Sequence, residues 1–96
     1  MPNSNELTFK EALEAWIRSL KQQSKFYQTK LEAAWPGLMG PVIAKYTVSL
    51  SIYRQTLFVQ LSSAPLRQEL NFSKDKIIKL VNEALGDPII KEVVIR

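Results

Sequence analysis

The sequence predicts a mixed α+β domain in which helices pack on a small three-stranded sheet. Three observations carry this prediction. Up to about residue 46 the apolar side chains follow helical spacing, whereas residues 48–62 alternate apolar and polar side chains. The final stretch "IIKEVVIR" is rich in β-branched side chains and predicts a last strand. Because 96 residues give room for one modest core, we expect a single domain over residues 1–96.

We expect three parts within this domain, and we find no repeats, low-complexity tracts or linkers between them. Residues 1–7 are expected to be a flexible N-terminus, residues 8–46 to be helical, and residues 47–96 to hold a hairpin, a helix pair and the last strand.

A first helix is expected over residues 9–22. Thr8 fits its N-cap, and Glu11 completes a capping box. Helical spacing gathers one apolar stripe, which consists of Phe9, Leu13, Trp16, Ile17 and Leu20.

Ser24 can cap a second helix, whose apolar stripe is Tyr27, Leu31, Ala34 and Trp35. We expect residues 36–37, Pro-Gly, to end or sharply bend it. A short third helix over residues 41–46 follows, with Pro41 in its first turn.

Residues 48–62 predict a hairpin centred on Arg54 and Gln55. In this register an aliphatic face pairs Ile52 with Leu57, Leu50 with Val59, and Val48 with Leu61. The other face carries Ser49, Ser51, Tyr53, Thr56, Phe58, Gln60 and Ser62. Since the turn has no glycine, we expect a loop slightly longer than two residues.

Two more helices are expected before the last strand. Ser63 begins the first and Ser73 restarts the second, which Gly86 caps at its C-terminal end. The second has a broad apolar stripe of Ile77, Ile78, Val81, Ala84 and Leu85. The last six elements then have the order helix-strand-strand-helix-helix-strand, which is the order of a type II KH module.

Residues 37–40, Gly-Leu-Met-Gly, spell G-x-x-G, the pattern with which KH loops clamp nucleic-acid backbone. This stretch precedes the hairpin instead of joining the helix pair, and its inner residues are apolar. We therefore interpret it as a structural elbow, in which Gly40 allows close backbone approach against Trp35 or a strand.

Composition argues against most enzyme chemistry. The chain has no cysteine and no histidine, which excludes disulfides, zinc ribbons and Ser-His or Cys-His nucleophiles. The nine acidic residues are spread out, so we expect no catalytic residues, no metal site, no cofactor and no small-molecule substrate. With no signal or membrane-spanning pattern, a cytoplasmic location is expected, without a membrane partner. The net charge of +4 permits nucleic-acid contact.

The order and spacing of several short motifs resemble the DciA family of small bacterial proteins over roughly residues 24–96. The matching residues are Trp35, Leu38, Met39, Gly40, Ile43, Ala44, Leu57, Val59, Leu61, Ser62, Ser63, Glu69, Leu70, Val81, Asn82, Leu85, Gly86, Ile90, Val93 and Ile95. The resemblance implies a KH-like domain without a catalytic site. It implies the replicative DNA helicase as partner, with single-stranded DNA as a second candidate partner.

Seven basic residues are candidates for nucleic-acid binding: Arg18, Lys21, Lys25, Lys30, Arg67, Lys74 and Lys76. The first four, together with Lys10, surround the expected turn between the first two helices. Lys74 and Lys76 flank the junction of the later helix pair, where a KH clamp belongs, but residues 71–74 contain no glycine. The alternative for all of these residues is a solvated charged surface.

The aromatic residues also have two interpretations. Tyr53 and Phe58 can stack bases on an open sheet, but cover by the N-terminal helix, with Phe9 and Trp16 seeking burial, is favoured. Trp16 and Trp35 are expected in the core, and substantial exposure of either would favour a protein-binding patch.

Two functions compete with helicase assistance. One is a KH-like module that binds RNA or DNA in another process, with an affinity that falls steeply with salt. The other is a small enzyme, which would need a deep polar pocket with perturbed carboxylates and receives little weight.

Overall fold

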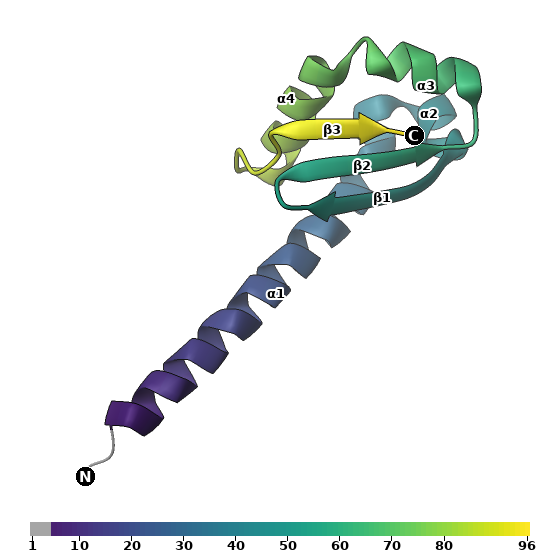
Figure 1. Cartoon of the computed structure of the whole chain (residues 1–96). Helices are drawn as coiled ribbons and strands as arrows, with labels where there is room; N and C mark the ends of the chain where they lie inside the picture. Colours follow the sequence, from purple (N-terminus) through teal and green to yellow (C-terminus); the bar gives the residue numbers. More distant parts are fainter. Residues whose placement is uncertain (1–4) are drawn as a thin grey trace.

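The computed structural model describes residues 5–96, with side chains from residue 8 onward (Figure 1). The elements are α1 (Asn5–Met39), α2 (Pro41–Tyr46), β1 (Thr47–Tyr53), β2 (Thr56–Leu61), α3 (Ala64–Asn71), α4 (Lys74–Leu85) and β3 (Glu92–Ile95). The described residues form four helices and one three-stranded sheet, which confirms the predicted α+β class. Of the N-terminus expected to be flexible, residues 1–4 lie outside the described part, and residues 5–7 belong to α1.

A single helix of 35 residues replaces the first two expected helices. The predicted break near Ser24 is wrong, because residues 9–35 contain neither glycine nor proline and a lone serine is tolerated inside a helix. Thr8 is therefore an interior residue of α1 and not its N-cap. The helix also does not end at residues 36–37, which was one of the two expectations for this stretch, since α1 continues through Pro36 to Met39.

Gly40 ends α1 with a φ angle of 93°, in a region that side-chain-bearing residues rarely adopt. Apart from Gly40 itself and its two chain neighbours, no atom of the described residues lies within 4 Å of the place where its Cβ would be, so the predicted close backbone approach is wrong. Glycine is required here by the backbone angle. The elbow itself is confirmed, and α2 begins directly after it with Pro41 in the first turn, as expected.

The sheet has the order β1-β2-β3, with β1 and β2 antiparallel and β2 and β3 parallel. Two of the three expected hairpin pairs, Leu50–Val59 and Ile52–Leu57, are confirmed. The third is wrong, because the register shifts after Thr47, which pairs with Leu61 and leaves Val48 60% exposed.

Hydrogen bonds of Thr47 explain this shift. Its hydroxyl donates to the carbonyl of Ile43 at 2.6 Å and accepts from the indole N–H of Trp35 at 2.9 Å. Thr47 is thereby held toward the core at the position expected for Val48.

The hairpin turn has only two residues, so the expectation of a longer loop is wrong. Arg54 and Gln55 both adopt positive φ angles, 48° and 65°, as a type I′ turn requires. The carbonyl of Gln55 accepts from the backbone N–H groups of Lys91 and Glu92, which fixes the turn against the chain entering β3.

The core lies on one face of the sheet. Its buried side chains are Leu31 and Trp35 of α1, Leu57, Val59 and Leu61 of β2, Leu70 of α3, Ile77, Val81 and Leu85 of α4, and Ile90 and Val93 near and in β3. In Figure 1 the helices lie behind and above the strands, and none crosses the front of the sheet. A sheet covered on one side keeps its other face in solvent.

The later helix boundaries follow the sequence closely. Ser63 is the N-cap of α3 and its hydroxyl accepts from the N–H of Leu66, whereas Ser73 occupies the N-cap position of α4 without such a bond. Gly86 ends α4 with a φ angle of 81°, as predicted. Beyond it, the Asn82 amide bonds both the N–H and the carbonyl of Ile90, each at 2.9 Å, and thus directs the chain into β3.

The free edge of β1 is closed by a side chain of α1. The Gln28 amide donates to the carbonyl of Leu50 at 2.6 Å and accepts from the N–H of Ile52 at 3.2 Å. It thus satisfies backbone groups that an edge strand otherwise exposes.

Gln28→Ala should lower the free energy of unfolding by about 1–2 kcal/mol, because it removes two hydrogen bonds to edge backbone. Urea denaturation measures this loss. Gln22→Ala, the same change on an exposed part of α1, is the matched control and should be nearly neutral. Equal effects of the two substitutions would contradict the edge-closing role of Gln28.

Gln55→Gly should raise the free energy of unfolding by about 0.5–1 kcal/mol. A left-handed conformation costs a side-chain-bearing residue roughly 1–2 kcal/mol, and glycine removes this cost. Glycine also raises the entropy of the unfolded chain, which lowers the stability by roughly 0.4–1 kcal/mol and offsets part of the gain. Gln55→Ala keeps the strain and should change little. A destabilised glycine variant in thermal denaturation would refute a strained turn.

Candidate functional site

The N-terminal half of α1 projects away from the rest of the protein (Figure 1). Residues 8–26, called the arm below, are all exposed, and the molecule spans 64 × 21 × 21 Å. Residues 27–96, called the body, hold every buried side chain found among residues 8–96. A helix of 35 residues is about 52 Å long, so a body this small covers only its C-terminal part.

The arm carries an uncovered apolar stripe. It consists of Phe9, Leu13, Trp16, Ile17 and Leu20, here called the arm stripe. Phe9 is 70% exposed and Trp16 59%. The expectation of a core position is confirmed for Trp35 and wrong for Trp16, because the predicted fold-back of the N-terminal helix onto the sheet does not occur.

The arm stripe continues along α1 into the core. Tyr27, Leu31 and Trp35 follow it at helical spacing and pack in the body. One face of one helix is thus buried at its C-terminal end and bare at its N-terminal end. Apolar side chains gathered on a projecting helix are typical of a protein-binding surface.

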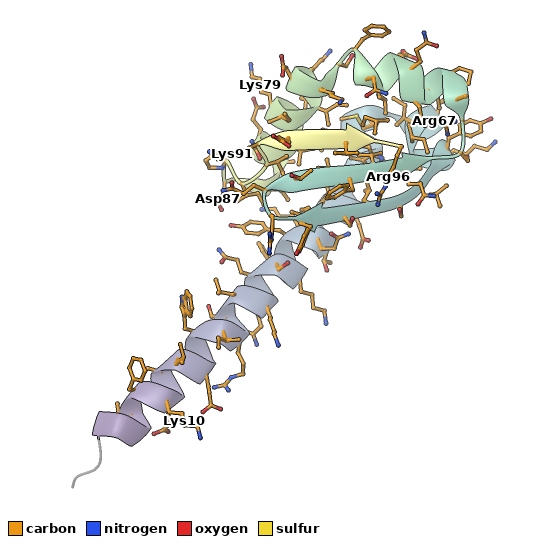
Figure 2. The ribbon with its side chains drawn as sticks, viewed as in Figure 1. Lys10, Arg67, Lys79, Asp87, Lys91 and Arg96 are labelled. Atoms are coloured by element: carbon orange, nitrogen blue, oxygen red, sulfur yellow. The ribbon has the colours of Figure 1, made fainter. Side chains whose placement is uncertain are left out.

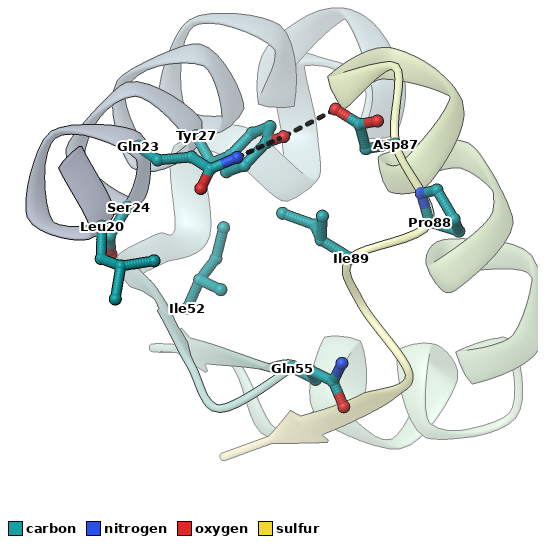
Figure 3. A pocket seen from close by; sticks show the side chains of 9 residues that line it. All are labelled: Leu20, Gln23, Ser24, Tyr27, Ile52, Gln55, Asp87, Pro88 and Ile89. Atoms are coloured by element: carbon teal, nitrogen blue, oxygen red, sulfur yellow. Dashed lines mark hydrogen bonds between the residues drawn. The ribbon is translucent and has the colours of Figure 1, made fainter. Parts of the chain in front are cut away.

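A hollow lies where the arm meets the body (Figure 3). Leu20, Gln23 and Ser24 line it from the arm side, facing the hairpin and the loop after α4. Across it the Tyr27 hydroxyl donates to the Asp87 carboxylate at 2.6 Å, and Gln23 donates to the Tyr27 oxygen at 3.5 Å. The Asp87 hydrogen bond, followed by burial, raises the pKa of Tyr27. This bond ties α1 to the body at the base of the arm.

The basic residues predicted around a turn instead lie along a continuous helix. Arg18, Lys21 and Lys25 share one exposed face of the arm through their i, i+3, i+7 spacing. Lys30 is not part of this face: its ammonium group donates to the carbonyl of Leu85 at 3.4 Å and lies 5.5 Å from the ring centre of Phe26.

The remaining predicted residues lie on the body. Arg67 is half-buried, and its guanidinium donates to the carbonyl of Leu61 at 2.8 Å, which gives it a structural partner. Lys74 and Lys76 are exposed at the α3–α4 junction, beside Phe72, which is 83% exposed. The structure therefore brings together Arg18, Lys21 and Lys25 on the arm and Lys74 with Lys76 at the α3–α4 junction, but it does not gather all seven predicted residues in one place.

A second surface is the sheet face that carries no helix. Tyr53 is 61% exposed on it and Phe58 is half-buried, so the predicted helix cover over these aromatics is wrong. The Arg54 guanidinium lies 5.3 Å from the centre of the Tyr53 ring, and the Arg96 guanidinium lies 5.0 Å from that of Phe58. Figure 2 shows Arg96 extending across the front of the sheet.

Sequence reasoning missed both arginines of this face. Arg54 was available as the residue after Tyr53 in the turn. Arg96 could have been found from the period of two in the last strand, where it follows Glu92 and Val94 on one face.

Within the described residues, no three metal-binding side chains cluster. Among the described helices, none combines the length and apolarity needed to cross a membrane.

Comparison with known protein families matches residues 8–95 to the family described as Dna[CI] antecedent, DciA. The chain belongs to the DciA family. The match runs from the start of the arm to the end of β3, so the arm and the body are both part of the DciA pattern. A search of curated proteins finds no match. Membership of the DciA family gives the chain a helicase-associated role in DNA replication.

Tyr27→Phe should destabilise this DciA-family protein at neutral pH, because it removes the hydrogen bond that holds α1 to the loop after α4. Folding raises the pKa of Tyr27, so the stabilisation is present below the unfolded phenol's pKa of about 10. It is lost as the pH rises through the folded value.

Urea denaturation of both proteins at pH 8 and at pH 11 measures this difference. Tyr53→Phe, on the exposed sheet face, is the control and should show no such change. A Tyr27→Phe deficit that stays constant between the two pH values would contradict the assignment.

Proposed function

We propose that this protein is a non-catalytic accessory protein of the bacterial replicative helicase. It binds the helicase through the arm stripe and engages single-stranded DNA during replication in the cytoplasm. Membership of the DciA family supports the choice of partner. The exposed stripe is the observation that carries the binding mode.

The arm stripe has the composition of a binding helix. Phe9 and Trp16 are large anchors of the kind that dominate protein interfaces. Fully burying one such side chain contributes roughly 1.5–3 kcal/mol. An apolar groove on the partner would receive the stripe as amphipathic helices are commonly received.

The basic face of the arm is available at the same time. At about 100° per residue, Arg18 and Lys25 lie about 160–180° around the helix from Trp16. A helicase bound to the stripe would therefore leave this face open to DNA phosphates. We propose Arg18, Lys21 and Lys25 as such backbone contacts, with Lys74 and Lys76 as further candidates.

The body supports a KH-like assignment through its element order. From α2 onward the chain runs helix-strand-strand-helix-helix-strand, as in a type II KH module. Residues 71–74 at the α3–α4 junction contain no glycine, which argues against the usual G-x-x-G clamp at that place. The proposed DNA contacts therefore do not depend on that loop.

Trp16→Ala should weaken binding to the helicase of the same organism about 30-fold or more, the effect of losing an anchor worth about 2 kcal/mol. Isothermal titration calorimetry measures the affinity. Gln22→Ala, on the other side of the arm, is the matched control. Both variants should keep their melting temperature, because neither side chain is in the core.

Two outcomes would contradict this proposal. One is the absence of any complex at micromolar concentrations. The other is equal affinity of the Trp16→Ala variant and the unchanged protein.

A further inference from the structure

We propose that the helix-free face of the sheet is a stacking platform for single-stranded DNA. Tyr53 and Phe58 stack successive bases, and Arg54 and Arg96 bind the adjoining phosphates. This inference rests on the DNA-binding part of the proposed function and gives it a site that is separate from the arm.

The strand register places the two aromatic rings as neighbours on one face. Tyr53 is opposite Thr56, and Phe58 is opposite Ser51, so the rings stand on a diagonal across β1 and β2. Such diagonal neighbours are about 7–8 Å apart. This is roughly twice the 3.4 Å spacing of bases in a duplex strand, so only bases separated from each other, as in an unpaired strand, can cover both rings.

Each ring already has a planar cation over it. The guanidinium carbons of Arg54 and Arg96 lie 5.3 Å and 5.0 Å from the centres of the Tyr53 and Phe58 rings, within the range of a cation–π contact. Both arginines are exposed, so they can move aside when a base takes their place. A displaced guanidinium then reaches the neighbouring phosphate, for which its fork of donors is well suited.

The charge of the face matches a polyanion. Arg54 and Arg96 are opposed by one carboxylate, that of Glu92, which pairs with Thr56 at the start of β3. The same face carries the polar side chains Ser49, Ser51 and Gln60, which are hydrogen-bonding partners for base edges and sugar–phosphate oxygens.

The same composition argues against a protein in this place. Apart from the two aromatics and the half-buried Val94, the face is polar, whereas protein interfaces have an apolar centre. A two-fold contact between copies would bring four guanidinium groups and only two Glu92 carboxylates together. The arm stripe, in contrast, has the composition that suits a protein partner.

The backbone of Arg54 is held in the hairpin turn at an energetic cost. Arg54 has a φ of 48°, where asparagine or glycine is favoured, and the turn is held by the bonds from Lys91 and Glu92 to Gln55. The backbone thus places Arg54 at the end of the face, next to Tyr53.

The test measures binding of a fluorescently labelled 12-nucleotide oligo(dT) to the full chain by anisotropy. Tyr53→Ala and Phe58→Ala should each weaken binding about 5-fold or more, the lower end of the effect of losing one stacked base. Tyr53→Phe keeps the ring and should bind like the unchanged protein. Melting temperatures verify that each variant is folded.

The salt dependence tests the arginines. Arg54→Ala with Arg96→Ala should lower the slope of log affinity against log salt concentration by about 1.4, or about 0.7 for each phosphate that the variant no longer neutralises. Lys79→Ala, which removes an exposed charge on α4 away from this face (Figure 2), is the control and should leave the slope unchanged.

Three results would overturn the sheet-face site. The first is unchanged DNA binding in both aromatic variants. The second is binding that disappears only on charge reversal of Lys21 and Lys25. The third is tighter binding of oligo(U) than of oligo(dT), which would assign the face to RNA.

Helicase titration with the same variants keeps the two proposals apart, because Tyr53→Ala should bind the helicase normally and Trp16→Ala should bind DNA normally.

Discussion

The structure depends on a core that forms on only one side of a three-stranded sheet. Leu31 and Trp35 of α1 pack with α4 against the inner side chains of β2 and β3. In a chain of this length, that single packed layer uses most of the apolar residues of the body. The opposite sheet face and the arm receive no cover in the described part of the chain, and both are available to partners.

The same helix that completes the core also provides the free surface. Its C-terminal part is held by Gln28 on the edge of β1, by Tyr27 on Asp87 and by the Trp35–Thr47 hydrogen bond. Because an α-helix is rigid over a few turns, these bonds also set the direction of the arm. The arm stripe and the body therefore share one continuous element.

Parts of both candidate surfaces were visible in the sequence. The apolar stripe from Phe9 to Leu20 follows from helical spacing, and the shared face of Tyr53 and Phe58 follows from alternation. Whether these side chains were covered did not follow, because periodicity shows that residues share a face and not what packs against it. The contact of Arg96 with the Phe58 ring could be predicted only with knowledge of the parallel register of β2 and β3, which pairs segments more than thirty residues apart.

The sequence by itself determined the α+β class, the later helix caps at Ser63 and Gly86, most of the hairpin register and the family resemblance, because these depend on local periodicity and turn chemistry. Tertiary structure decided that Thr47 replaces Val48 toward the core and that the turn is tight. Each of these outcomes depends on competition between distant partners for the same buried space or hydrogen bond. Local propensity carries no information about that competition, which is why the exposed arm and the open sheet face appear only in the folded chain.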